Sequence, residues 1–356
     1  MARRMKSKIQ PSVLKINFRL DDTSGGTVPQ GTTQTYYIDL SQCASIVNRR
    51  FYRQGLNWAV AGFKFDTPVT SSLVVQKLPN TWVMSNAWEK GFRAWQKMIK
   101  HAVDETDQQS VKGKFLDFKI HADKYHKELG FDKNLLPVTY DIFGGNNPVT
   151  TVTEVKPGEW IPATLEVPVT REITQLPQIM GETAEYEIMA VGANYPLDSK
   201  GNQLNVVSLI NGYANSRALP SISDPNTPDD IDDAAGVTPE NWLAAMFNDG
   251  VAQDSGVIED IVAYDQPPYP YQNDGTSTKT MYPGGEEQMS SLETHSLVSV
   301  TATTVGGMTR FEGGNFPCGL IAVHFHPEGN SAIAGLEVTL VPGEHRGYLC
   351  ESMTEM

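Results

Sequence analysis

The nine residues SVLKINFRL, at positions 12–20, alternate between apolar and polar side chains. The apolar members lie on one face of an extended chain and the polar members on the other: Leu14, Ile16, Phe18 and Leu20 against Lys15, Asn17 and Arg19. A period of two residues is that of a β-strand with one buried face. The stretch therefore predicts a half-buried strand whose outer face is cationic.

Similar runs recur along the chain and predict a mostly-β protein. Further strands are expected at 34–40, 56–65, 73–78, 115–121, 138–142, 160–169, 186–191, 204–212, 294–304, 318–326 and 336–341. The 22 Pro and 30 Gly favour many short strands joined by turns, and Gly306–Gly307 and Gly313–Gly314 are interpreted as turn glycines. We expect a single jelly roll, an eight-stranded two-sheet β-sandwich with long loops and one or two short helices.

One segment departs from the β pattern. From Ser85 to about Val103, apolar residues recur at helical spacing: Trp88, Phe92, Trp95, Met98, Ile99 and Ala102. Asn86 and Glu89 are three residues apart, as in a capping box. The remaining face is basic: Lys90, Arg93, Lys97 and Lys100. We expect a helix that packs its aromatic side on a sheet, and its basic side is a weaker candidate for contact with nucleic acid.

The charge of the chain is unevenly distributed. Residues 1–127 hold 20 of the 28 Lys and Arg but 10 of the 42 Asp and Glu, within a net charge of -14. This asymmetry suggests that a basic part meets a polyanion while the rest faces water, although uneven surface charge that serves solubility would look the same. Within the basic part, Arg49, Arg50 and Arg53 flank Phe51 and Tyr52. These arginines are candidate nucleic-acid contacts, and the aromatic rings are candidates for base stacking or for the core.

Composition argues against several classes of protein. No run of about 18 apolar residues predicts a membrane span, and no apolar stretch follows the basic start as in a secretory signal. Cys43, Cys318 and Cys350 are too few and too scattered for a disulfide framework or a zinc site. No phosphate-binding P-loop and no Gly-x-Ser-x-Gly elbow occurs, so we expect no enzyme.

Two weaker candidate metal sites remain. His324 and His326 fall on one face of an expected strand, with Glu328 close behind and His345 and His295 as distant further ligands. A structural pair, or a pH-sensitive contact between subunits, explains this pattern better. An acidic loop could bind calcium at an interface between subunits, but it lacks EF-hand spacing and is interpreted as a solvated loop; its candidate ligands are Asp229, Asp230, Asp232 and Asp233. No resident cofactor is expected.

Two segments carry a resemblance to a known family. PNTWVMSNAWEKGFRAWQKM (79–98) and VPGEHRGYLCESMTEM (341–356) resemble segments of the capsid proteins of small circular single-stranded DNA viruses that encode a replication initiator. The resemblance covers about a tenth of the chain, and the three Trp of the first segment are its most distinctive feature. It implies a jelly roll whose copies close an icosahedral shell around the genome.

The resemblance also implies a basic N-terminal arm that faces the packaged DNA. Residues 1–11 would form it, with the cations Arg3, Arg4, Lys6 and Lys8, and Lys15 and Arg19 would continue it. Residues 12–356 would be the jelly-roll domain, with surface loops at about 219–237 and 264–290 and a short helix after Thr238. This arm holds fewer arginines than arms of the family, so we expect one subunit to bind DNA weakly and many copies to bind it strongly.

The sequence thus predicts a self-assembling capsid protein found in the virion, with passage through a host nucleus as a weaker expectation. Its partners would be its own copies and single-stranded DNA. Two alternatives stay open. One is a metal-dependent cupin-like enzyme that uses His324 and His326. The other is a carbohydrate-binding β-sandwich, since exposed aromatic residues in loops can stack on sugars.

Overall fold

The computed structural model describes residues 12–22, 24–106, 117–141, 151–154, 158–168, 183–218 and 291–356. The chain divides into two compact units, residues 1–211 with 288–356 and residues 212–287, and the second lies almost wholly outside the described residues. The predicted arm at 1–11, the loops at 219–237 and 264–290, and the helix after Thr238 also lie outside them. None of the described helices is both long enough and apolar enough to cross a membrane.

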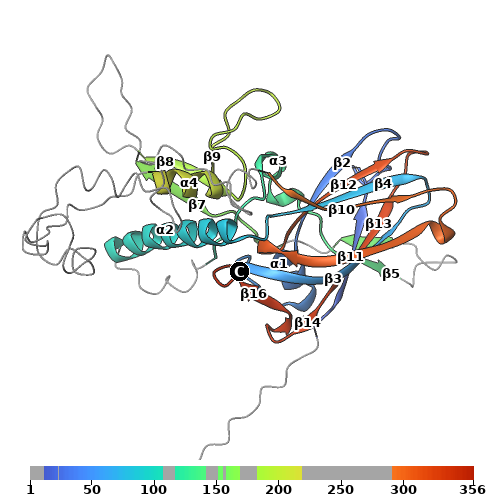
Figure 1. The fold of residues 1–356 in the computed structure, drawn as a ribbon, viewed down its shortest axis with the longest axis horizontal. Coiled ribbons are helices and arrows are strands. Elements are labelled where there is room, and N and C mark those ends of the chain that lie inside the picture. Colours follow the sequence, from blue (N-terminus) through green and yellow to red (C-terminus); the bar gives the residue numbers. More distant parts are fainter. Residues whose placement is uncertain are drawn as a thin grey trace, which may run out of the picture. The chain divides into compact units, whose positions relative to one another are not determined.

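Two antiparallel sheets dominate the first unit (Figure 1). One has the order β1 (Lys15–Leu20), β13 (Ala334–Leu340), β3 (Leu56–Asp66) and β11 (Met308–Phe316), and the short β16 (Cys350–Ser352) also pairs with β3. The other has the order β10 (Glu293–Val300), β4 (Ser71–Lys77), β12 (Leu320–Pro327) and β2 (Gln34–Asp39). The expectation of a mostly-β fold built on two sheets is confirmed.

The pairing of these eight strands follows one rule. Counted along the chain, the first pairs with the eighth, the second with the seventh, the third with the sixth and the fourth with the fifth: β1·β13, β2·β12, β3·β11 and β4·β10. All four pairs are antiparallel, so the first four strands and the last four run side by side like the two arms of one long β-hairpin, which we call the hairpin strip. Additional pairing of β13 with β3 and of β12 with β4 joins the strip into the two sheets.

The two sheets bury one common hydrophobic core. On β1, Ile16, Phe18 and Leu20 are at most 2 % exposed, as the alternation in the sequence predicts. Rings meet across the core, since Phe65 of β3 lies edge-on to Phe325 of β12 with their centroids 6.0 Å apart. Burial of this apolar surface is the main force that holds the sandwich together.

The predicted helix exists as α2 (Trp82–Thr106), but the details of the prediction need correction. The helix begins before Ser85, so Asn86 lies inside it and does not cap it. At 25 residues it is also longer than the short helices expected. Three further helices were not predicted: α1 (Leu40–Asn48), α3 (Lys124–Leu129) and α4 (Leu209–Ala218).

A long insertion separates β4 from β10 in the chain and carries α2, α3 and α4. It also holds the pair β5 (Val138–Asp141) and β6 (Thr151–Glu154), and the three-stranded sheet of β7 (Thr164–Pro168), β8 (Thr183–Met189) and β9 (Val206–Ser208). Two strand predictions fail here. Residues 117–120 form no strand, and the strand expected at 204–212 gives way to α4 after Ser208.

The glycine pairs near the C-terminal strands differ in their roles. Gly306 and Gly307 lie in a turn with φ of 74° and 63°, as predicted. Gly313 and Gly314 lie inside β11, so their interpretation as turn glycines is wrong. A Cβ on Gly313 would lie 1.9 Å from the carbonyl oxygen of Val60, so the close approach of β11 to β3 requires glycine there.

Smaller elements are the pair β14 (Pro342–Gly343) and β15 (Gly347–Tyr348) and 3₁₀ turns at Phe131–Lys133, Val305–Gly307 and Pro317–Gly319.

Candidate nucleic-acid interface

Three of the predicted arginines lie in the connection between α1 and β3. The helix starts where the Asp39 carboxylate accepts hydrogen bonds from the backbone N–H groups of Ser41 and Gln42. It ends at Arg49, whose left-handed backbone (φ 53°, ψ 37°) turns the chain away from the helix axis. Arg50 and Arg53 follow in the extended segment that leads into β3. The local fold thus places three cations within five residues.

A fourth arginine reaches this connection from the far end of the chain. Arg346 lies between β14 and β15 with φ 52°, and its Nη1 donates a hydrogen bond to the backbone carbonyl of Phe51. Its own carbonyl accepts from the hydroxyl groups of Ser12, at 2.8 Å, and Tyr52, at 3.0 Å, and from Nη1 of Arg50 at 3.5 Å. We call Arg49, Arg50, Arg53 and Arg346 the arginine cluster. Since Ser12 is the first described residue, residues 1–11 join the described chain at this cluster.

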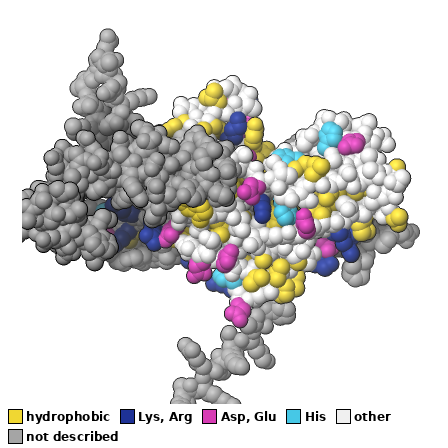
Figure 2. All heavy atoms as spheres, in the orientation of Figure 1, with side chains coloured by type: hydrophobic (Ala, Val, Ile, Leu, Met, Phe, Trp, Pro, Cys, Tyr) yellow, Lys and Arg dark blue, Asp and Glu magenta, His cyan; other side chains and the backbone are white. Residues whose placement is uncertain are grey.

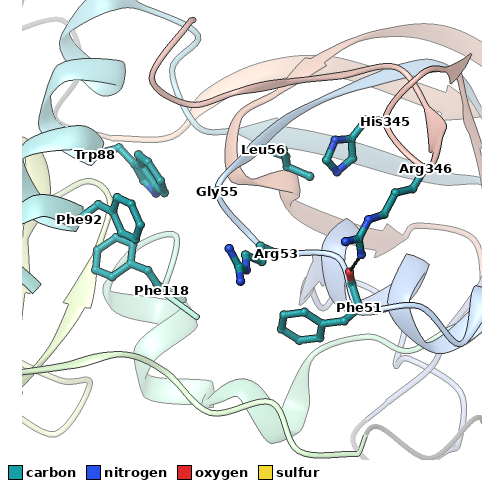
Figure 3. A pocket seen from close by; sticks show the side chains of 9 residues that line it. All are labelled: Phe51, Arg53, Gly55, Leu56, Trp88, Phe92, Phe118, His345 and Arg346. Carbon is teal, nitrogen blue, oxygen red and sulfur yellow. Dashed lines mark hydrogen bonds between the residues drawn. The ribbon is translucent and has the colours of Figure 1, made fainter. Parts of the chain in front are cut away.

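An open pocket of about 470 Å³ adjoins the arginine cluster (Figure 3). Two of the four arginines belong to its lining, and the other lining residues are aromatic, apolar or a histidine: Phe51, Arg53, Gly55, Leu56, Trp88, Phe92, Phe118, His345 and Arg346. Trp88, Phe92 and Phe118 form one wall, where the Trp88 and Phe92 rings stack at 4.9 Å and the Phe92 and Phe118 centroids are 5.5 Å apart. Trp88 packs directly on Gly55, where a Cβ would lie 2.5 Å from the indole ring.

The polar groups of this pocket differ in whether they have a partner. Arg53 is exposed and makes no hydrogen bond or ion pair with the described residues. The indole Nε1 of Trp88 is buried and has no hydrogen-bond partner among them. Burial and the neighbouring Arg346 lower the pKa of His345, so this imidazole is neutral at pH 7. The pocket therefore combines permanent positive charge with donors that have no partner.

A further cation–aromatic group lies beside Phe51. Nζ of Lys119 lies 4.5 Å from the centroid of the Trp160 ring and 6.0 Å from that of Phe51, and it pairs with the carboxylate of Asp117. Trp160 is anchored in turn by a 3.0 Å hydrogen bond from its Nε1 to Asp39. Burial raises the pKa of Asp39 to about 6, while the hydrogen bonds it accepts act in the opposite direction.

Not all predicted contacts belong to this interface. Lys15 pairs with Glu337 at 2.8 Å and Arg19 with Asp21 at 3.0 Å, both on or next to β1. Arg3, Arg4, Lys6 and Lys8 lie outside the described residues. Of the two rings considered for base stacking, Tyr52 is 1 % exposed and belongs to the core, whereas Phe51 is 47 % exposed.

The histidine pair of β12 is held by neighbouring side chains. Nδ1 of His324 contacts the hydroxyl of Thr35 at 2.9 Å, and its Nε2 contacts the Gln76 amide oxygen at 2.9 Å. His326 contacts Thr33 at 3.1 Å. Within the described ranges, no group of three or more His, Cys, Asp or Glu side chains could hold a metal ion. The calcium candidates, Asp229, Asp230, Asp232 and Asp233, fall outside those ranges.

Sequence reasoning found the arginines around Phe51 but missed their partners. Arg346, Trp88 and Phe118 come from three distant segments, and no local pattern connects them. The left-handed backbone of Arg49 and Arg346 gives no signal in the sequence either. No family model, curated protein or solved structure matches the chain.

Proposed function

We propose that this chain is the capsid protein of a small single-stranded DNA virus, whose copies assemble into an icosahedral shell around the genome. The pairing of its eight strands carries the proposal. One antiparallel strip rolled into two sheets is the arrangement expected of a jelly roll, an architecture that viral capsid proteins use. The resemblance of residues 79–98 and 341–356 to capsid segments points the same way.

The arginine cluster supports DNA as the cargo. Four permanent cations lie together where residues 1–11 join the domain, and those residues contribute four more. Each phosphate neutralised by a cation releases counterions, so a shell that repeats this cluster many times would bind a polyanion strongly even where one copy binds weakly.

The described surface also supports self-association. Leu297 of β10 is 70 % exposed and Val305 in the following turn is 93 % exposed. In the face seen in Figure 2, Lys and Arg side chains lie interspersed with Asp and Glu, and hydrophobic side chains gather in places between them. Burial of such apolar groups between neighbouring copies is the usual source of stability in closed assemblies.

Electron microscopy of purified protein in negative stain, with nuclease digestion, tests this function. We expect uniform spherical particles and a nuclease-protected fraction of added single-stranded DNA. Monomers that stay monomeric with single-stranded DNA would contradict it.

A pocket on the outer side of the second sheet favours one alternative, the binding of neutral carbohydrate. This cavity of about 800 Å³ is lined by Tyr125, Asp123, Glu128, Gln34, Gln76 and His324 among others. Tyr125 is 55 % exposed, and an exposed ring beside carboxylates and amides suits a polyhydroxyl ligand. A glycan array would test this; saturable binding by monomers that never assemble would favour this alternative over the capsid.

A further inference from the structure

The pocket beside the arginine cluster has two chemically different sides (Figure 3). Trp88, Phe92 and Phe118 make an aromatic wall that is braced from behind by Trp95, whose ring centroid is 5.5 Å from that of Phe118. Arg53 and Arg346 bring positive charge from the other side, and none of the described lining residues is acidic. A ligand that satisfies both sides must be flat and apolar at one end and anionic at the other.

We propose that this pocket binds one nucleotide of the packaged strand, with its base among the aromatic rings and its phosphate on Arg53 and Arg346. The proposal rests on the proposed function, because it assigns the place where one subunit holds single-stranded DNA. It goes beyond the charge of the arm and the arginine cluster by adding a specific subsite for a base.

The aromatic residues supply the affinity for the base. Phe51, which lines the pocket, leaves 47 % of its surface exposed, so its ring is accessible to a ligand. Stacking of a base on such a ring tolerates any sequence, as genome packaging requires.

The two arginines supply the affinity for the phosphate. Arg53 makes no hydrogen bond or ion pair with the described residues, so its whole fork of donors is available. Arg346 is held in place through its bond to the Phe51 carbonyl and keeps further N–H groups for a ligand. The volume, about 470 Å³, lies within the range of small-molecule sites and suits one nucleotide rather than a run of bases.

Calorimetric titration of the full-length protein tests the assignment with three probes: deoxyadenosine monophosphate, deoxyadenosine and inorganic phosphate. The nucleotide should bind saturably and at least tenfold more tightly than either of the other two, because only it uses both sides of the pocket. Equal affinity for phosphate and nucleotide would reduce the pocket to an anion site and overturn the proposal.

Single substitutions test whether the nucleotide binds in this pocket. Arg53→Gln and Phe51→Ala should each weaken nucleotide binding at least tenfold, and both residues are exposed, so the fold should survive. Arg310→Gln is the matched control, since it removes the same charge from an exposed position on β11 opposite Lys64, at the other end of β3 from Leu56. Unchanged binding in both pocket variants, or an equal loss in the control, would overturn the proposal.

Particle formation is scored separately by negative stain on the same samples. Shells that form without saturable nucleotide binding would overturn the pocket assignment and leave the proposed capsid function intact. Nucleotide binding by protein that never forms shells would support the pocket and contradict the capsid function.

Discussion

At the scale of single residues, a cation is available for binding only where the fold leaves it without a partner. Lys15 and Arg53 are both exposed, but Glu337 lies 2.8 Å from Nζ of Lys15 and no described carboxylate pairs with Arg53. The sequence alone gives no reason to expect that one of these two cations contacts nucleic acid and the other does not. The difference comes from the register of β1 and β13, which places Glu337 next to Lys15.

The first prediction compares these two cations. Arg53→Gln should weaken binding of a labelled oligothymidylate severalfold, whereas Lys15→Gln should change it little, because Glu337 already offsets the charge of Lys15. Fluorescence anisotropy at low and moderate salt measures both. The Lys15–Glu337 pair is also exposed, so its loss should cost at most about 1 kcal/mol of stability. Equal losses of binding would mean that overall charge, and not the pocket, holds the DNA.

The second prediction concerns a buried histidine. The ring of His126 stacks on Tyr37 at 4.5 Å, its Nδ1 accepts from the Ala122 N–H, and its Nε2 donates to Asn134. Burial, with the neighbouring His121, lowers the pKa of His126 from 6.5 to about 3. The unfolded chain therefore binds more protons than the folded chain between pH 6.5 and pH 3. The stability that this histidine contributes is complete above pH 6.5 and is lost as the pH falls through that range.

Thermal unfolding between pH 7 and pH 4 should therefore show a falling melting temperature. His126→Gln should be less stable at pH 7, because it disturbs the stack and both hydrogen bonds, but its melting temperature should depend less on pH. A pH dependence as steep as that of the unaltered protein would show that His126 does not cause it.

At the scale of elements, β11 shows where sequence patterns fail. Its two central glycines lower β propensity and suggest a turn, yet Gly313 faces the Val60 carbonyl so closely that no other residue fits. Strand β1 was predictable because it alternates apolar and polar residues against the core, and β2, β3 and β4 were predictable from short runs of β-branched, aromatic and other apolar residues. Helix α1 was missed because its short amphipathic pattern is weak, although Asp39 does give a capping signal.

The third prediction follows from that close approach. Gly313→Ala should force β11 away from β3 and destabilise the domain by about 1–3 kcal/mol or more, as other overpacked sites do. Gly212→Ala in α4 is the control, since no atom of the described residues lies within 4 Å of its added methyl group and alanine favours a helix by about 1 kcal/mol. Chemical denaturation measures both. An unchanged midpoint for Gly313→Ala would mean that the two strands do not approach so closely.

In the candidate site, too, the sequence predicts which residues are neighbours along the chain but not which distant residues the fold brings together. The cluster of arginines around Phe51 is visible in the sequence because its members are neighbours. Two residues of the aromatic wall, Trp88 and Phe92, are visible in the sequence as part of the apolar face of a helix, but nothing in their spacing says that they lie near Phe118 or Arg53. The pairing of β16 with β3 joins the C-terminal end of the chain to the strand that follows residues 51–55, and the packing of Trp88 of α2 on Gly55 adds the aromatic wall.

At the scale of the whole molecule, the negative charge is concentrated in one segment. Residues 219–290 hold 14 of the 42 Asp and Glu and one of the 28 Lys and Arg. Nearly all of the net charge of -14 therefore belongs to this segment, and the rest of the chain is close to neutral. In the proposed shell, such a segment on the outside of the particles would keep them apart by repulsion, while the arginine cluster would face the genome.

The fourth prediction tests how copies associate. Leu297→Asp and Val305→Asp place a charge on two of the most exposed apolar side chains described, so they should raise the protein concentration needed for assembly and leave the melting temperature of the unassembled chain almost unchanged. Light scattering against concentration measures the first effect and thermal unfolding the second. Normal assembly of both variants would place the contacts between copies elsewhere.

The size and form of the purified protein test the proposed capsid function most directly. Light scattering and negative-stain microscopy at neutral pH and moderate salt, with and without single-stranded DNA, should reveal uniform closed spheres that protect DNA from nuclease. A monodisperse monomer that remains monomeric with added DNA would contradict the proposal that this fold builds a shell.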